Sequence, residues 1–154
     1  MIMPETLDGS ERETDDPRLN ALIRFYRAFN RRDLALMESC WAIDAEVTMS
    51  NPLGGIKRGW PEIAAVYARI FSGKTEVRVE FHDFILRGSE EMFVAVGRER
   101  GSVRTPAGTL DLRIRTSRIF EKMNGTWKQT HHHGSIDDAD MLRAYHTCLA
   151  AAQS

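Results

Sequence analysis

Hydrophobic residues recur at helical spacing in the first half of the chain. Asp15-Asp16-Pro17 combines carboxylate caps with a proline in the first turn, which predicts the start of a helix. One apolar helix face follows it: Leu19, Leu22, Ile23, Tyr26 and Phe29. Asp33 predicts the cap of a second, shorter helix, and Pro61 opens a third with a clean apolar stripe.

The two ends of the chain have a different pattern. Residues 1–16 are polar and acidic, and we expect them to form a flexible tail. Residues 137–154 contain an amphipathic pattern that predicts a C-terminal helix to Ala152, with Asp137 or Asp138 as its cap, packed on the domain. Residues 17–136 between them are of the length of one globular domain.

Alternating apolar and polar residues predict strands in the second half. A short strand is expected at 45–49, ending in the turn of Asn51-Pro52-Leu53-Gly54-Gly55. In 75–86 the apolar residues change parity near His82-Asp83, which indicates a bulge and a curved sheet. Further strands are predicted at 92–100, 110–120 and 127–136. Helices followed by a meander of long antiparallel strands predict an α+β fold.

The register of these strands determines which side chains face the helices. Asn124-Gly125 is a strong two-residue hairpin signal, and it places Arg118 opposite His131. A turn centred on Pro106-Ala107-Gly108 places Val96 opposite Arg118 and Arg98 opposite Thr116. The more apolar face of this arrangement carries Arg98, Arg118, His131 and His133, and we assign it to the core side, although a slip of one residue would reverse the assignment.

Two guanidinium groups and two imidazoles on an inner face predict a pocket for a carboxylate or another anion. The same arginines could instead reach solvent or pair with carboxylates such as Glu62 or Glu46, and the histidines could be ordinary core residues. Trp41 and Tyr67 fit the core or the wall of such a pocket.

Composition narrows the classes of partner. A net charge of −1 and a pI of about 6.5 predict no general attraction to nucleic acid or to an anionic membrane. Cys40 and Cys148 do not form a disulfide or metal pattern, and no signal or membrane-spanning segment is visible, so we expect a cytoplasmic protein. Adjacent strand residues point to opposite faces, so only His131 and His133 could share an ion, and we expect neither a metal nor a cofactor.

Residues 18–136 resemble the nuclear-transport-factor-two-like superfamily, which includes ketosteroid isomerase, SnoaL-like cyclases and scytalone dehydratase. The resemblance is based on element order, on 51–55 followed by Gly59 and the Pro61 helix, and on Gly125-Thr126-Trp127 with the strand ending at Ser135. It implies a cone-shaped curved sheet wrapped around helices, a central cavity and a homodimer through the outer sheet face.

The C-terminal half is most similar to the association domain of calcium/calmodulin-dependent kinase. There an arginine-hydrophobic-aromatic triplet, a Gly-x-Trp turn and a His-x-His-x-Ser strand match Arg118-Ile119-Phe120, 125–127 and 131–135. The matching arginine and an earlier one, here Arg98, line an anion-accepting pocket in that domain.

Ketosteroid isomerase differs at its reacting groups. Its general base corresponds to Asn51, an amide that takes no proton at neutral pH, and its first-helix tyrosine aligns with Phe25, beside Tyr26. Both differences argue against steroid isomerisation by the usual route.

The sequence therefore predicts a small-molecule-binding domain for an anionic or polar organic ligand. The predicted ligand-contacting residues are Arg98, Arg118, His131, His133, Asn51, Tyr26, Trp41 and Tyr67. The alternatives are a cofactor-independent isomerase, cyclase or dehydratase, in which His131 or His133 is the acid or base, and a purely structural module.

Overall fold

The structure is a computed structural model that describes residues 3–151. Its helices are α1 (Pro17–Asn30), α2 (Leu34–Cys40), α3 (Trp60–Phe71) and α4 (Ala139–Ala151). Its strands are β1 (Thr6–Leu7), β2 (Thr48–Ser50), β3 (Lys57–Arg58), β4 (Glu76–Gly88), β5 (Met92–Thr105), β6 (Gly108–Met123) and β7 (Thr126–Ser135). Within these residues the strands form one mixed sheet in the order β1-β4-β5-β6-β7-β2-β3.

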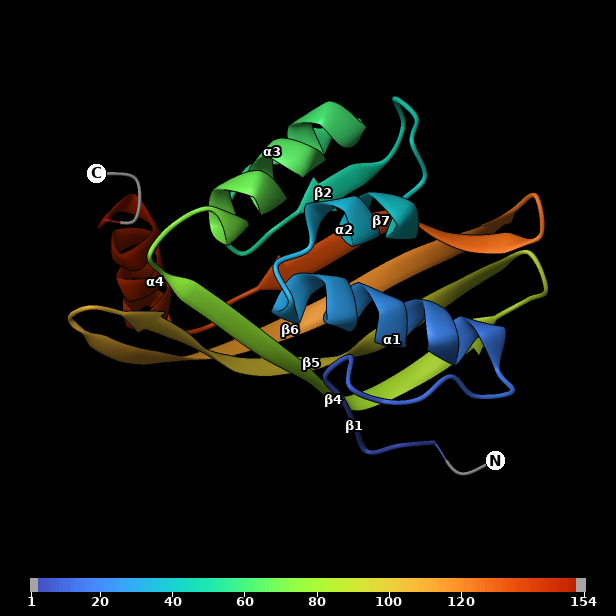
Figure 1. The fold of residues 1–154 in the computed structure, drawn as a ribbon, viewed down its shortest axis with the longest axis horizontal. Helices are drawn as coiled ribbons and strands as arrows, with labels where there is room; N and C mark the ends of the chain where they lie inside the picture. Colours follow the sequence, from blue (N-terminus) through green and yellow to red (C-terminus); the bar gives the residue numbers. More distant parts are fainter. Residues whose placement is uncertain (1–2, 152–154) are drawn as a thin grey trace.

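The helices α1, α2 and α3 lie on one face of the curved sheet, and α4 lies at one end of it (Figure 1). Side chains from the three helices and from the inner sheet face form a single hydrophobic core. This is the α+β cone that the sequence predicts, with the additional C-terminal helix. No helix among residues 3–151 is both long and apolar enough to cross a membrane.

The helices begin where their capping residues predict. The carboxylate of Asp16 accepts a hydrogen bond from the Arg18 N–H at 2.9 Å, and Pro17 occupies the first turn of α1. Asp33 caps α2 in the same way. Asp138 accepts from the Met141 N–H, so it caps α4, while position 152 of the predicted helix lies outside the described residues.

The N-terminal segment corrects the expectation of a flexible tail. Residues 1 and 2 of that tail lie outside the described residues, but β1 pairs with β4, and Leu7 is fully buried. Arg27 of α1 donates to the carbonyls of Gly9 and Glu11 at 2.8 and 2.6 Å. One apolar side chain and these backbone hydrogen bonds hold an otherwise acidic segment against the domain.

Strand β4 contains the predicted bulge. Its register against β5 shifts between His82 and Ile85, and Asp83 adopts a positive φ of 48°. Val77 and Val79 are buried before this point, whereas Ile85 beyond it is 60% exposed. The bulge bends the strand, as expected for a sheet that curves around helices.

The β5–β6 hairpin differs from its predicted register by one residue. The loop consists of two residues, because Thr105 pairs with Gly108, and Ala95 therefore lies opposite Arg118. The predicted pairing of Val96 with Arg118 is wrong, and so is the inward orientation of even-numbered β5 residues. Phe93, Ala95 and Glu99 face the core, whereas Arg98 is exposed on the outer face.

The β6–β7 hairpin confirms the predicted turn but not the register beyond it. Asn124 and Gly125 both have positive φ, and Met123 pairs with Thr126. A bulge then leaves Thr130 without a paired residue in β6, so Arg118 pairs with His132 instead of His131. The extra residue turns His132 inward and His131 outward.

Candidate functional site

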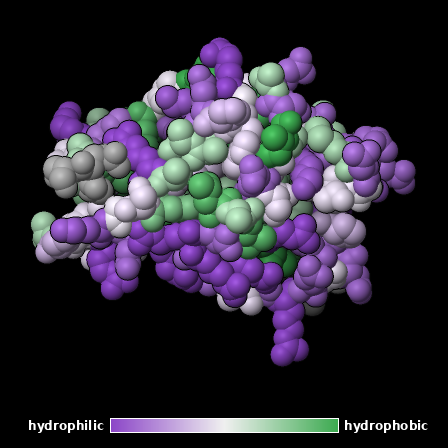
Figure 2. Space-filling view, turned by 45° about the horizontal axis from the view of Figure 1, so that its top comes forward, coloured by the Kyte–Doolittle hydropathy of each residue, from purple (hydrophilic) through white to green (hydrophobic). Residues whose placement is uncertain are grey.

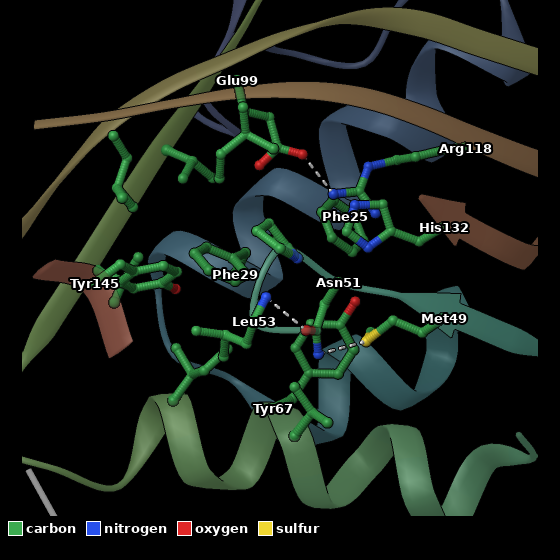
Figure 3. A pocket seen from close by; sticks show the side chains of 17 residues that line it. Phe25, Phe29, Met49, Asn51, Leu53, Tyr67, Glu99, Arg118, His132 and Tyr145 are labelled. Carbon is green, nitrogen blue, oxygen red and sulfur yellow. Dashed lines mark hydrogen bonds and ion pairs between the residues drawn. The ribbon is translucent and has the colours of Figure 1, made fainter. Parts of the chain in front are cut away.

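A small cavity lies between the inner sheet face and the helices. Its volume is about 50 Å³, and most of its wall is apolar. Figure 3 shows Arg118, His132 and Phe25 together at one end and Tyr145 at the other, with Tyr67 of α3 on the opposite wall from Glu99. The polar atoms at the Arg118 end define what this cavity can bind.

Arg118 is buried, and each of its three guanidinium nitrogens donates to a partner. Its guanidinium pairs with Glu99 at 2.8 Å and donates to Gln129 Oε1 at 2.9 Å and to Tyr26 Oη at 3.3 Å. The guanidinium carbon also lies 3.7 Å from the centre of the Phe25 ring. Burial opposes the charged form, but nearby Tyr26 and Glu99 raise the pKa of Arg118, so it remains a cation.

Glu99 is the charged partner of Arg118, and the strand register predicted from the sequence does not place it there. Its Oε1 accepts hydrogen bonds from Tyr26 Oη at 3.3 Å, Thr116 Oγ1 at 3.1 Å and Arg118 Nη2 at 2.8 Å. The one-residue error in register had placed this carboxylate on the outer face. The available signal was that Glu99 shares its parity with Phe93 and Ala95, but Val94 and Val96 form an equally apolar set.

His132 is the imidazole that reaches the cavity. It is 7% exposed, and neither ring nitrogen has a hydrogen-bond partner in the described part of the chain. Burial, together with the charge of Arg118, holds the pKa of His132 well below 6.5, so the ring is neutral at neutral pH. A neutral imidazole presents one N–H donor and one acceptor nitrogen.

Two tyrosines and an amide complete the polar set. Tyr67 Oη is buried without a partner within residues 3–151, and burial raises the pKa of Tyr67 and of Tyr145, which keeps both hydroxyls protonated. Asn51 accepts from the Leu53 N–H at 2.9 Å and lies 3.7 Å from the Met49 sulfur. Its amide therefore organises the turn at the cavity wall.

The predicted site residues that lie on the core side form two groups. Arg118, Asn51 and Tyr67 line the cavity. Tyr26 and Trp41 are buried next to it, Tyr26 against Glu99 and Trp41 with its ring centre 6.3 Å from that of Tyr67.

The inward placement of Arg98, His131 and His133 is wrong. Arg98 Nε lies 3.7 Å from Oδ2 of exposed Asp83. His131 Nδ1 lies 2.6 Å from Thr48 Oγ1 of the neighbouring strand, and His133 is exposed. The shorter β5–β6 loop reverses the face of Arg98, and the extra residue Thr130 in β7 reverses the faces of His131 and His133. The carboxylate that neutralises Arg118 is Glu99, and neither Glu62 nor Glu46 takes this role.

The sequence model of the SnoaL-like domain family matches residues 19–139. The chain therefore belongs to the SnoaL-like domain family, and α4 lies almost entirely beyond the matched part. The comparison with curated proteins gives no match.

Solved structures show the same fold at low identity. A Streptomyces avermitilis protein called a "putative dehydratase from the NTF2-like family" superposes with a TM-score of 0.73 at 19% identity, over 80% of this chain and 95% of that one. A "putative calcium/calmodulin-dependent protein kinase type II association domain" from Thiobacillus denitrificans gives 0.65 at 22%, over 82% and 100%. A protein with a cystatin-like fold from Caulobacter vibrioides gives 0.65 at 16%, over 84% and 93%.

Proposed function

We propose that this chain binds a small, mainly apolar organic molecule whose hydrogen-bonding group reaches His132 and Tyr67. The observation that carries the proposal is the pair of unpartnered nitrogens of buried His132 at the cavity wall. Buried polar atoms normally have partners, and a partner from outside the chain would satisfy these.

The charge balance favours an uncharged group at this end. Arg118 and Glu99 neutralise each other, and His132 is neutral, so the polar end of the cavity has no net charge to attract an anion. The carboxylate ligand expected from free inner arginines therefore has no basis at this position. A carbonyl or hydroxyl group would match the donor and acceptor that His132 and Tyr67 offer.

A thermal-shift screen of small aromatic ketones and phenols tests the proposal. We expect stabilisation by at least one compound in the wild type and its loss in His132→Phe, which keeps a ring but removes both nitrogens. His133→Phe is the matched control, because it changes a histidine on the exposed face of the same strand. Stabilisation by none of the compounds would instead favour the structural module, which the internal pairing of Arg118 also fits.

A second candidate function is proton-transfer catalysis of the dehydratase or isomerase type. It is favoured by the neutral imidazole of His132 in an apolar cavity, where it could accept a proton from a bound substrate. His131 and His133 cannot take this role from the outer face. We expect the wild type to dehydrate a β-hydroxy ketone, which the absorbance of the enone product measures. His132→Phe should lose this activity, and turnover that persists in this variant would exclude the role of His132.

We also propose that the chain forms a homodimer through the outer sheet face. Ile85 and Val96 are 60% and 41% exposed there and lie opposite each other in neighbouring strands. Light scattering after size-exclusion chromatography should give a dimer mass for the wild type and a smaller mass for Val96→Glu. A monomeric wild type would contradict this proposal.

A further inference from the structure

A second, larger hollow adjoins the cavity on its helix side. It has a volume of about 290 Å³ and lies between α3, the turn after β2 and α4. Four residues line both spaces: Asn51, Leu53, Val66 and Ile70. We call this hollow the vestibule. On the face that carries α3, hydrophobic residues form a broken band between hydrophilic areas (Figure 2).

The lining of the vestibule is partly apolar and contains two positive charges without partners. Lys57 and Arg69 line it, and neither side chain makes a hydrogen bond or ion pair with any residue from 3 to 151. His146 of α4 also lines it. The single carboxylate in its lining, that of Glu62, already accepts a hydrogen bond from the Arg58 N–H at 2.6 Å.

The volume of the vestibule matters because the inner cavity alone is too small for an organic ligand. A cavity of about 50 Å³ holds only a few atoms, whereas sites for organic ligands typically span about 300–1,000 Å³. We place the outer part of a ligand anchored beside His132 in the vestibule, because the two spaces share the wall that contains Leu53 and Ile70. Its outer end then lies near Lys57 and Arg69.

We propose that Lys57 and Arg69 form a subsite for an anionic group, and that the ligand is an apolar carboxylate whose charged end stays in the vestibule. This inference rests on the proposed ligand-binding function and adds the position and sign of the ligand's charge. Two cations beside a shared apolar wall suit a carboxylate with an aromatic or alkyl body, because its charge remains hydrated at the mouth while the body is buried. The neutral inner cavity thus binds the uncharged body of the ligand, and the cationic vestibule binds its charged end.

A matched pair of probes tests the subsite. 4-(4-Hydroxyphenyl)butyrate and 4-(4-hydroxybutyl)phenol share a phenol group that can reach His132 and Tyr67. They differ only in the outer end, which is a carboxylate in the acid and a hydroxyl in the alcohol, and isothermal titration calorimetry measures both affinities. We expect the acid to bind about three- to tenfold more tightly than the alcohol, which is the scale of two partly exposed ion pairs. The preference should shrink as salt is added.

The variants separate a local subsite from a general effect of charge. In K57Q/R69Q we expect the acid to lose its preference while the affinity of the alcohol is unchanged. R31Q/R87Q removes the same charge from exposed arginines that do not line the vestibule, and it should retain the preference. All four substitutions lie outside the fully buried core, and the thermal unfolding of each variant verifies its folding.

Each alternative outcome has a definite meaning. Binding of both probes with equal affinity would overturn the anionic subsite and leave the proposed function standing. The same loss of preference in R31Q/R87Q would also overturn the subsite, because the effect would then be long-range. Binding of neither probe would overturn both proposals for this class of ligand.

Discussion

The buried pair of Arg118 and Glu99 makes a strong prediction about stability. Their side chains are 2% and 7% exposed, and the bond between them measures 2.8 Å. Glu99→Gln keeps the shape of the side chain and one acceptor oxygen but removes the charge that balances Arg118. The guanidinium then remains buried among Phe25, Tyr26 and Gln129 without a counter-ion.

The expected cost is large relative to the stability of a domain. Removing one partner of a buried ion pair typically costs about 3–5 kcal/mol, and a domain has about 5–15 kcal/mol in total. We expect about 3 kcal/mol for Glu99→Gln, because the amide oxygen can still accept hydrogen bonds from Tyr26 and Thr116. For a domain of this size, that corresponds to a fall in Tm of roughly 6–12 °C.

Urea unfolding followed by tryptophan fluorescence measures this cost, because Trp41, Trp60 and Trp127 are all buried in the core. Glu76→Gln is the matched control. Glu76 pairs with Arg104 at 2.9 Å, but the two side chains are 55% and 72% exposed, so we expect a cost of about 0–1 kcal/mol.

A double-mutant cycle tests the physical reason. Arg118→Met removes the cation, and the double variant E99Q/R118M leaves no unbalanced charge, so its cost should be smaller than the sum of the single costs by about 2 kcal/mol or more. Additive costs, or a Glu99→Gln cost as small as that of Glu76→Gln, would refute the reasoning that a balanced buried charge holds this site together.

Two further predictions concern His132 and the N-terminal segment. The unfolded chain protonates His132 near pH 6.5, whereas the folded state keeps it neutral to well below that value. The unfolded state therefore holds more protons below pH 6.5, and stability should fall by up to about 1.4 kcal/mol per pH unit as pH decreases from about 7 toward 5. Urea unfolding across this range should show a shallower fall in His132→Phe, and an identical fall would be inconsistent with a neutral buried ring. Leu7→Ala should cost about 2–5 kcal/mol in the same assay because Leu7 is fully buried, whereas a flexible tail would give no change.

Local chemistry in the sequence was sufficient to predict most of the elements. The caps at Asp16 and Asp33, the Asn124-Gly125 turn and the parity change at Asp83 each depend on a few neighbouring residues. These signals predicted the α+β fold and the order of its elements, because capping, turn geometry and side-chain alternation act over short stretches of chain.

The site depends on pairing between residues that are distant in the sequence, and no local sequence pattern specifies that pairing. A loop shorter by one residue at Pro106-Ala107 and one extra residue at Thr130 exchanged the faces of Arg98 with Glu99 and of His131 with His132. Side chains alternate with a period of two, so a single-residue shift exchanges the two faces of a strand. Together, these two shifts replace the expected cluster of cations with a balanced ion pair beside a neutral imidazole. The sequence alone therefore determined that Arg118 lies on the core side of a curved sheet, and only the tertiary structure decided which charge meets it there.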